Sequence, residues 1–123
     1  MQLNSGVRRL HRHMTGQQLR LEPVAPHEQF APCLGMVQRS IAYDGEQWEL
    51  LELDSSIAHL GFEYRHVLVR SRRGEPALGG PEPAQIFILL VANLEVLDRV
   101  ERNEPVTFMW SIIRGRAAAA TVV

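Results

Sequence analysis

The chain has 123 residues and a formal net charge of -1, because 13 arginines, with no lysine present, oppose 14 acidic residues. Its length suits one domain, and its 46% apolar and 22% charged residues are typical of a globular protein, which excludes a largely disordered chain. The near-zero charge excludes a global attraction to nucleic acid or to an anionic membrane, so any basic surface must be local.

Cysteine content and hydropathy indicate the compartment. Cys33 is the only cysteine, which excludes an internal disulfide and a zinc site built from several cysteines. The basic residues 1–13 lack the apolar centre of a signal peptide, and no run approaches the roughly 18 apolar residues that span a bilayer. We therefore expect a soluble, cytoplasmic protein that has no membrane contact and needs no cofactor.

Three segments divide the chain. Residues 1–13 are interpreted as a flexible basic arm or as residues that precede the true start at Met14. Residues 14–116 are predicted to form a single β-rich domain, and residues 117–123 a disordered tail.

The first strand is predicted over residues 17–24, where Leu19 and Leu21 alternate with polar side chains. Prolines then indicate a loop, and a second strand is expected over residues 33–43. Gly35 within it permits a bulge or a close approach of a neighbour. One face of this strand is predicted to carry Val37, Ile41 and Tyr43.

A hairpin is predicted at Asp44-Gly45, because this pair accepts the positive φ angles of a tight turn. The third strand should then cover residues 48–53. The polar residues 54–56, together with Gly61, are predicted to form a turn-prone link to the next strand.

The fourth strand is predicted over residues 62–71, with Tyr64, His66 and Leu68 facing one way. Residues 74–83 hold several glycines and prolines and indicate a long loop. Residues 85–91 are apolar without alternation, which is typical of a strand buried on both faces.

Asn93 is a predicted N-cap for a single helix over residues 94–103, which Pro105 ends. A last strand is predicted over residues 106–113. Strands joined by turns favour antiparallel pairing, so the expected fold is mainly β: a small antiparallel β-barrel of SH3-like or OB-like size, with about six strands and one short helix.

The best candidate site is the fourth strand and its exit. Arginines and a histidine lie there beside an aromatic side chain, in a pattern that suits phosphate pairing next to base stacking. The candidate binding residues are Tyr64, Arg65, His66, Arg70, Arg72 and Arg73. The alternative is structural: Arg65 and Arg70 would pair across strands with Glu49, Glu52 or Asp54.

Catalytic and metal sites have less support. Cys33 with His59 or His66 as its base would be the minimum for a thiol enzyme, but Cys33 follows a proline at a strand start, where a buried inert thiol is favoured. His11 and His13 lack a third metal ligand. No phosphate-binding glycine loop or catalytic motif occurs.

Arg8 and Arg12 have the spacing Arg-x-x-x-Arg, and Asp54 and Ser56 begin a pattern Asp/Asn-x-Ser-x-x-Gly. These two motifs partly resemble those of PilZ domains, and the resemblance implies binding of a cyclic dinucleotide. The second motif requires glycine at position 59, but this chain has His59 there. The next glycine, Gly61, comes two residues late.

Two functions follow. The first is a non-catalytic binding module that engages nucleic acid or another anionic partner through the arginine-rich strand. The second is an accessory protein that associates with itself into a homo-oligomer, through an interface formed by surplus apolar side chains. The residues expected to supply that interface are Trp48, Phe62, Phe108, Met109 and Trp110.

Overall fold

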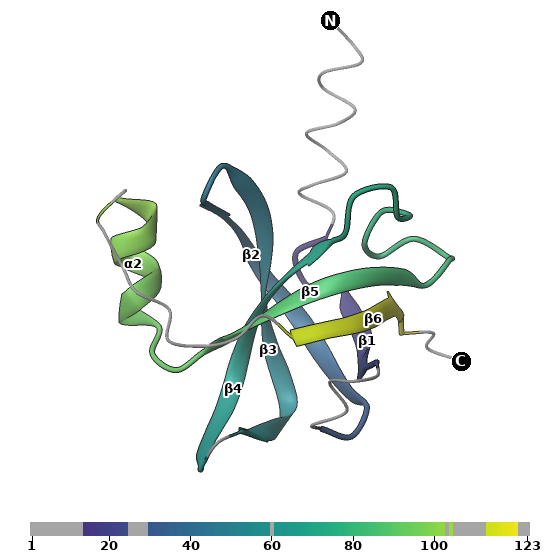
Figure 1. Cartoon of the computed structure of the whole chain (residues 1–123), viewed down its shortest axis with the longest axis horizontal. Coiled ribbons are helices and arrows are strands. Elements are labelled where there is room, and N and C mark those ends of the chain that lie inside the picture. Colours follow the sequence, from purple (N-terminus) through teal and green to yellow (C-terminus); the bar gives the residue numbers. More distant parts are fainter. Residues whose placement is uncertain (1–13, 25–29, 60, 103, 105–112, 121–123) are drawn as a thin grey trace, which may run out of the picture.

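The computed structural model describes residues 14–24, 30–59, 61–102, 104 and 113–120. They form a closed antiparallel barrel in which each strand pairs with its neighbour in sequence and the last strand pairs with the first (Figure 1). The elements are β1 (Gln18–Pro23), β2 (Cys33–Tyr43), β3 (Glu46–His59), β4 (Phe62–Ser71), β5 (Ala84–Val91), α2 (Glu95–Glu101) and β6 (Ile113–Ala119). The predicted fold class, a six-stranded antiparallel barrel with one short helix, is confirmed.

The β2–β3 hairpin turns at the predicted pair. Asp44 and Gly45 have φ angles of 54° and 74°, and the flanking Tyr43 and Glu46 are paired. Two successive positive φ angles match the twist of antiparallel strands, which explains why this sequence turns here.

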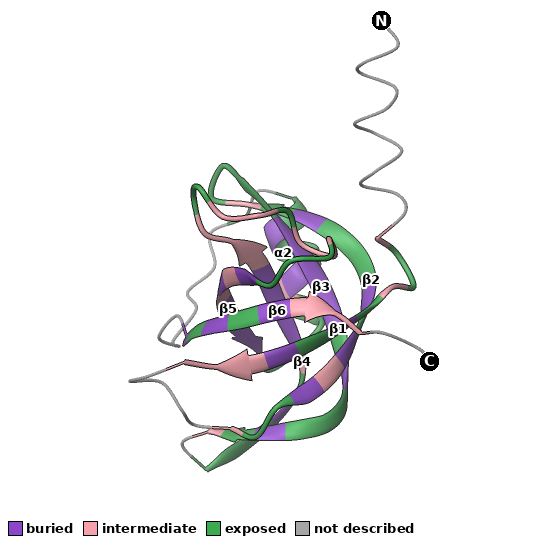
Figure 2. Ribbon diagram, turned by 90° about the vertical axis from the view of Figure 1, so that its right-hand side faces the viewer, coloured by how far each residue is buried: buried purple, intermediate pink, exposed green. Residues whose placement is uncertain are grey.

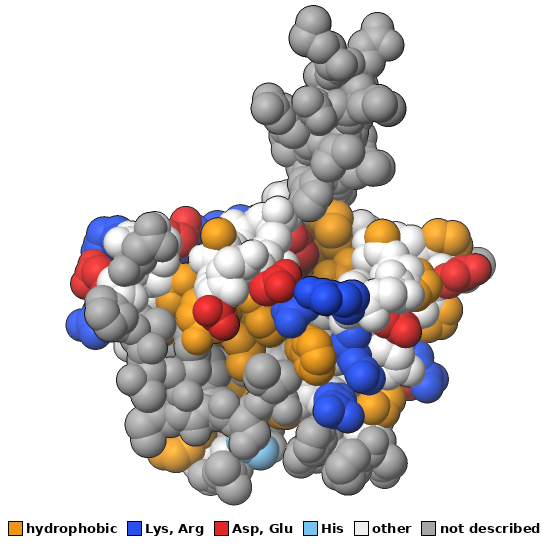
Figure 3. Space-filling view, turned by 45° about the horizontal axis from the view of Figure 1, so that its top comes forward, with side chains coloured by type: hydrophobic (Ala, Val, Ile, Leu, Met, Phe, Trp, Pro, Cys, Tyr) orange, Lys and Arg blue, Asp and Glu red, His pale blue; other side chains and the backbone are white. Residues whose placement is uncertain are grey.

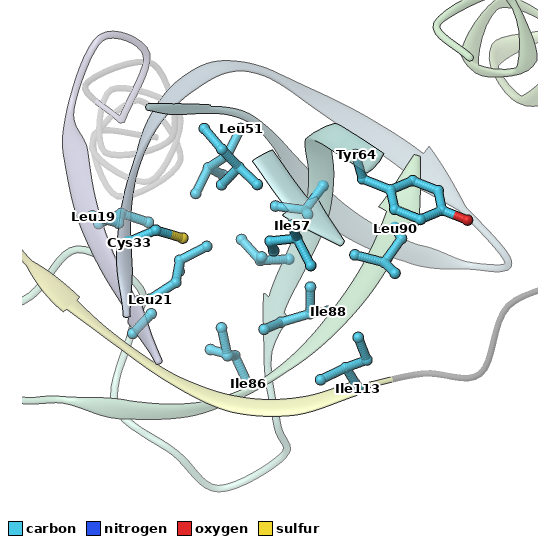
Figure 4. Packing of buried hydrophobic residues seen from close by; sticks show 14 of the residues in the cluster. Leu19, Leu21, Cys33, Leu51, Ile57, Tyr64, Ile86, Ile88, Leu90 and Ile113 are labelled. Atoms are coloured by element: carbon cyan, nitrogen blue, oxygen red, sulfur yellow. The ribbon is translucent and has the colours of Figure 1, made fainter. Parts of the chain in front are cut away.

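Inward-facing side chains fill the barrel with apolar groups (Figure 4), and buried residues alternate with exposed ones along the strands (Figure 2). This interior cluster consists of Leu19, Leu21, Cys33, Val37, Leu51, Leu53, Ile57, Tyr64, Val67, Val69, Ala84, Ile86, Ile88, Leu90, Ile113 and Ala117. Gly35 allows the predicted close approach, because a Cβ there would lie 2.8 Å from Leu51 Cδ2.

A second apolar cluster lies on the outer face of the barrel, where α2 covers it. Leu97 and Val100 of the helix pack on outward side chains of four strands. Those strand residues are Ile41, Trp48, Leu50, Leu68, Leu89 and Val91. The helix explains why β5 lacks alternation: its inner face fills the barrel and its outer Leu89 and Val91 lie under α2. Arg39 of β2 also forms an ion pair with Glu101 of α2.

The helix covers Glu95–Glu101, which is shorter than the predicted range 94–103, and Leu94 instead of Asn93 occupies its N-cap position. Asn93 still contributes to the helix start, since its Oδ1 accepts a hydrogen bond of 2.8 Å from the Glu95 backbone N–H. Leu94 precedes the helix and is 47% exposed, so it does not share the buried face.

Two register irregularities overturn local predictions. Between Val37 and Arg39 the β2–β3 pairing shifts, so Val37 points inward while Ile41 belongs to the outer cluster. The second irregularity lies between Glu52 and Ile57, where the predicted link of residues 54–56 is part of β3 instead of a turn.

The second irregularity also changes the faces of β4. Tyr64 pairs with Ile57 and points inward with Val67, whereas Leu68 points outward. Strict alternation over residues 62–71, which placed Tyr64 and Leu68 on one face, is therefore wrong, because it holds only where no extra residues enter the ladder.

The barrel extends beyond the predicted boundary at residue 116. Ala117, Ala118 and Ala119 belong to β6 and pair with Leu21, Arg20 and Leu19 of β1, so part of the predicted tail closes the barrel. Residues 1–13, 105–112 and 121–123, which include the predicted arm and most of the predicted last strand, lie outside the described residues. No helix in the described parts of the chain is long and apolar enough to cross a membrane.

Candidate functional site

The structure divides the predicted site residues into two groups. Arg70, Arg72 and Arg73 border one hollow at the end of β4. Tyr64 is buried in the interior cluster, and His66 lies four residues from Arg70, about 13 Å along a strand. The structure therefore brings together only half of the predicted set.

Arg65 and His66 have separate surroundings. Arg65 is exposed and does not line the hollow. His66 Nε2 lies 3.5 Å from Glu52 Oε2, directly across the β3–β4 ladder.

Two aromatic rings hold Arg70 in place. Its guanidinium carbon lies 5.2 Å from the centre of the Trp48 ring on β3 and 5.0 Å from that of the Phe87 ring on β5. Arg70 and Phe87 are directly paired, so the contact follows from strand register. Each such cation–π contact contributes about 0.5–2 kcal/mol and restricts the guanidinium to one orientation.

The arginine hollow, as we name it, has a volume of about 450 Å³. Its lining consists of Glu46, Arg70, Ser71, Arg72, Arg73 and Phe87. Arg72 lies over the same Phe87 ring at 5.6 Å, whereas Arg73 is exposed. Figure 3 shows arginine side chains gathered beside apolar side chains on one face of the molecule.

The alternative predicted for these arginines is pairing across strands with acidic side chains, and the described residues do not show such pairs. Among the described residues, neither Arg65 nor any arginine of the hollow forms an ion pair with an acidic side chain. The acidic residues of β3 have other partners: Glu49 accepts hydrogen bonds from Ser40, Glu52 lies beside His66, and Asp54 accepts one from the Leu34 N–H.

Sequence reasoning missed Trp48 and Phe87 as parts of this site. The sequence predicts a protein interface at Trp48 and a buried strand at Phe87. The signal that would have found them is cross-strand register: Glu49 pairs with Val69, which places Trp48 beside Arg70 at the next position. Register between β4 and β5 cannot be read from sequence, because a loop of twelve residues joins them.

Cys33 lies inside the barrel and is only 8% exposed. Burial, supported by the negative charge of Asp54 and partly opposed by Arg20, raises the pKa of its thiol to about 11. Within the described ranges no side chain hydrogen-bonds to its sulfur, so no base is positioned to activate it. This environment favours an inert thiol.

We expect iodoacetamide to label Cys33 at least roughly 100-fold more slowly in the folded protein than in the urea-unfolded chain at neutral pH, because a two-unit rise in pKa lowers the thiolate fraction by that factor. Mass spectrometry of timed samples measures the labelling. Labelling at equal rates in both states would contradict this assignment.

The raised pKa also predicts a dependence of stability on pH. Because the thiol of the unfolded chain ionises first, the free energy of unfolding should fall as the pH rises from about 9 to about 11.

Other sequence features gain no support from the described residues. No group of three or more His, Cys, Asp or Glu side chains in these segments is arranged to hold a metal. Asp54 and Ser56 lie within β3, while Arg8, Arg12 and the histidines of the arm lie outside the description.

Of the five residues predicted to supply a self-association surface, the structure describes two, and one of these is buried. Trp48 is only 4% exposed, so it belongs to the outer cluster instead of a free interface. Phe62 is 67% exposed, whereas Phe108, Met109 and Trp110 lie outside the described residues.

No protein-family model, no curated protein and no solved structure matches this chain. Functional inference therefore depends on the geometry of the site alone.

Proposed function

We propose that the barrel is a non-catalytic binding module that takes phosphate-bearing ligands, single-stranded nucleic acid in particular, in the arginine hollow. One observation carries the proposal: Arg70, Arg72 and Arg73 line a single hollow, and among the described residues none of them pairs with an acidic side chain. Arg70 donates one hydrogen bond within the protein, from Nη1 to the Ser71 carbonyl at 3.4 Å, and donors remain on all three guanidinium groups for a ligand.

The chemistry of the hollow favours phosphate. A guanidinium presents planar donors that match phosphate oxygens in pairs, and an orientation fixed in advance reduces the entropy lost on binding. Trp48 and Phe87 fix Arg70 in this way. Because the two rings contact arginines, they do not serve as stacking surfaces for bases. We therefore expect the hollow to recognise the phosphate backbone of a nucleic-acid strand, with little preference for base sequence.

Salt dependence tests this function. Three phosphate contacts to a single strand predict a slope of about -2 in log affinity against log salt, so affinity for a fluorescein-labelled oligothymidylate should fall about 20-fold between about 50 and 200 mM salt. Replacing Arg70, Arg72 and Arg73 together by alanine should bring the slope close to zero. Fluorescence anisotropy measures both.

The matched control replaces Arg20, Arg65 and Arg99 by alanine, which changes the net charge equally at positions away from the hollow. This variant should keep the slope of the original protein. Equal losses in both variants would reduce the effect to general electrostatics and contradict a localised site. Absence of binding to the oligonucleotide and to inorganic polyphosphate would remove the proposal.

A further inference from the structure

A second hollow opens at the mouth of the barrel and adjoins the arginine hollow, since Arg70 and Ser71 at the end of β4 line both. This mouth pocket has a volume of about 450 Å³, within the range of small-molecule sites. Its lining consists of Met14, Gln17, Gln47, Glu49, Arg70, Ser71, Ala77, Leu78, Gly79 and Gly80. Glu49 shares the inward side of β3 with Leu51 of the interior cluster, and the loop between β4 and β5 forms a wall.

Hydrogen bonds hold that wall in place. Gln17 Nε2 donates to the Gly79 carbonyl at 3.0 Å, and Ser71 Oγ donates to the Pro76 carbonyl at 3.0 Å. Gly79 has a φ of 78°, and a Cβ there would lie 2.8 Å from Gln17 Oε1. The positive φ thus favours glycine where the loop meets Gln17, next to β1, and the pocket is formed before any ligand arrives.

Glu49 gives the pocket its chemical character. Its carboxylate belongs to the only buried charged residue in the described part of the chain, at 5% exposure. Its hydrogen-bond donors are neutral: Ser40 Oγ at 2.8 and 2.9 Å, and Gln47 Nε2 at 3.3 Å. Within the described ranges no cationic side chain forms an ion pair with it.

Arg70 borders the mouth pocket but does not neutralise Glu49. Its guanidinium lies over Trp48 and Phe87, whose side chains belong to the outer face. A buried carboxylate without a counter-ion is costly, so a cation that enters the pocket gains the attraction without having to desolvate the carboxylate further. The apolar walls at Met14, Ala77 and Leu78 suit a hydrocarbon body behind that cation.

We propose that the mouth pocket binds a small organic cation, an amine on an apolar body, whose ammonium group pairs with Glu49. This site shares Arg70 and Ser71 with the arginine hollow, but its ligand has the opposite charge and its key residue, Glu49, lines the mouth pocket alone. The two ligand classes can therefore be tested separately on one protein.

Hexylamine and hexan-1-ol are matched probes, since they share a hydrocarbon chain and differ in charge. We expect hexylamine to shift the amide NMR signals of the pocket residues in the full chain, with an affinity at least tenfold above that of hexan-1-ol. Glu49→Gln should lower the hexylamine affinity at least tenfold and leave hexan-1-ol unchanged. Glu52→Gln, which alters an exposed carboxylate on the same strand, is the control and should have no effect.

A second variant keeps the test decisive if Glu49→Gln does not fold. Ala77→Phe places a ring in the pocket and leaves Glu49 intact, so it should remove hexylamine binding. Equal affinities for the two probes, hexylamine binding unchanged in Glu49→Gln, or shifts confined to residues outside the pocket would each overturn the proposal. Loss of oligonucleotide binding in an Arg72→Ala, Arg73→Ala double variant, which leaves Arg70 of the mouth pocket in place, with hexylamine binding retained would show that the two proposals stand or fall separately.

Discussion

Trp48→Ala is expected to lower the free energy of unfolding by about 3–5 kcal/mol, the range for a large aromatic side chain removed from a packed core. Trp48 is 4% exposed and packs in the outer cluster between the barrel and α2. Its ring also packs against the guanidinium of Arg70, and the centre of the ring lies 6.5 Å from that of the Tyr43 ring. Its loss should therefore weaken the support of α2 and of the arginine hollow together. Urea denaturation followed by far-ultraviolet circular dichroism measures the change.

Phe62→Ala is the matched control, because it removes an aromatic side chain that is 67% exposed on β4. We expect it to change stability by less than about 0.5 kcal/mol. A double-mutant cycle between Trp48→Ala and Arg70→Ala should give a coupling energy of about 0.5–2 kcal/mol. A cost below about 1 kcal/mol for Trp48→Ala would contradict the packing described here.

The parts of the fold that sequence predicts well are those set by neighbouring residues. Asp44 and Gly45 determine their own turn, and the bounds of β2 and β4 match the predicted ranges 33–43 and 62–71. Asn93 and the apolar spacing behind it likewise indicate α2. Each of these depends on backbone preference or on a repeat within one element.

What sequence did not reveal depends on partners far along the chain. The irregularity between Glu52 and Ile57 exists only because β4 pairs with β3 on both sides of it. Local polarity at residues 54–56 indicated a turn, yet the segment remains extended. Similarly, the alanines of β6 carry no pattern of their own, and their pairing with β1 makes them strand.

The candidate site illustrates the same division. The arginine-rich exit of β4 is visible in the sequence, and Arg70, Arg72 and Arg73 do share a hollow. The acidic residues nearby in the sequence favour neutralised arginines, but proximity in sequence does not determine proximity in space. Register instead places Arg70 between aromatic rings of two different strands.

Gly115→Val should destabilise the barrel by about 3 kcal/mol or more, at or above the upper end of ordinary overpacking. Gly115 pairs with Pro23 of β1 and with Ile86 of β5, at the seam that closes the barrel. A Cβ at this position would lie 2.8 Å from the backbone oxygen of Glu22 and 2.8 Å from Ile88 Cδ1. Since the oxygen belongs to a paired strand, it cannot move aside without opening the ladder.

Urea denaturation and amide hydrogen exchange together test this seam. The Val24 and Ala120 amides donate to Arg114 and Gln18 carbonyls across it, at 3.2 and 3.0 Å, and should exchange faster in Gly115→Val than amides of the β2–β3 hairpin. Ala118→Val enlarges an outward side chain of the same strand and should cost less than about 0.5 kcal/mol. Equal stability of the two variants would mean that β1 and β6 tolerate separation, and the closed barrel would then not be the unit that holds the mouth pocket and the arginine hollow in place.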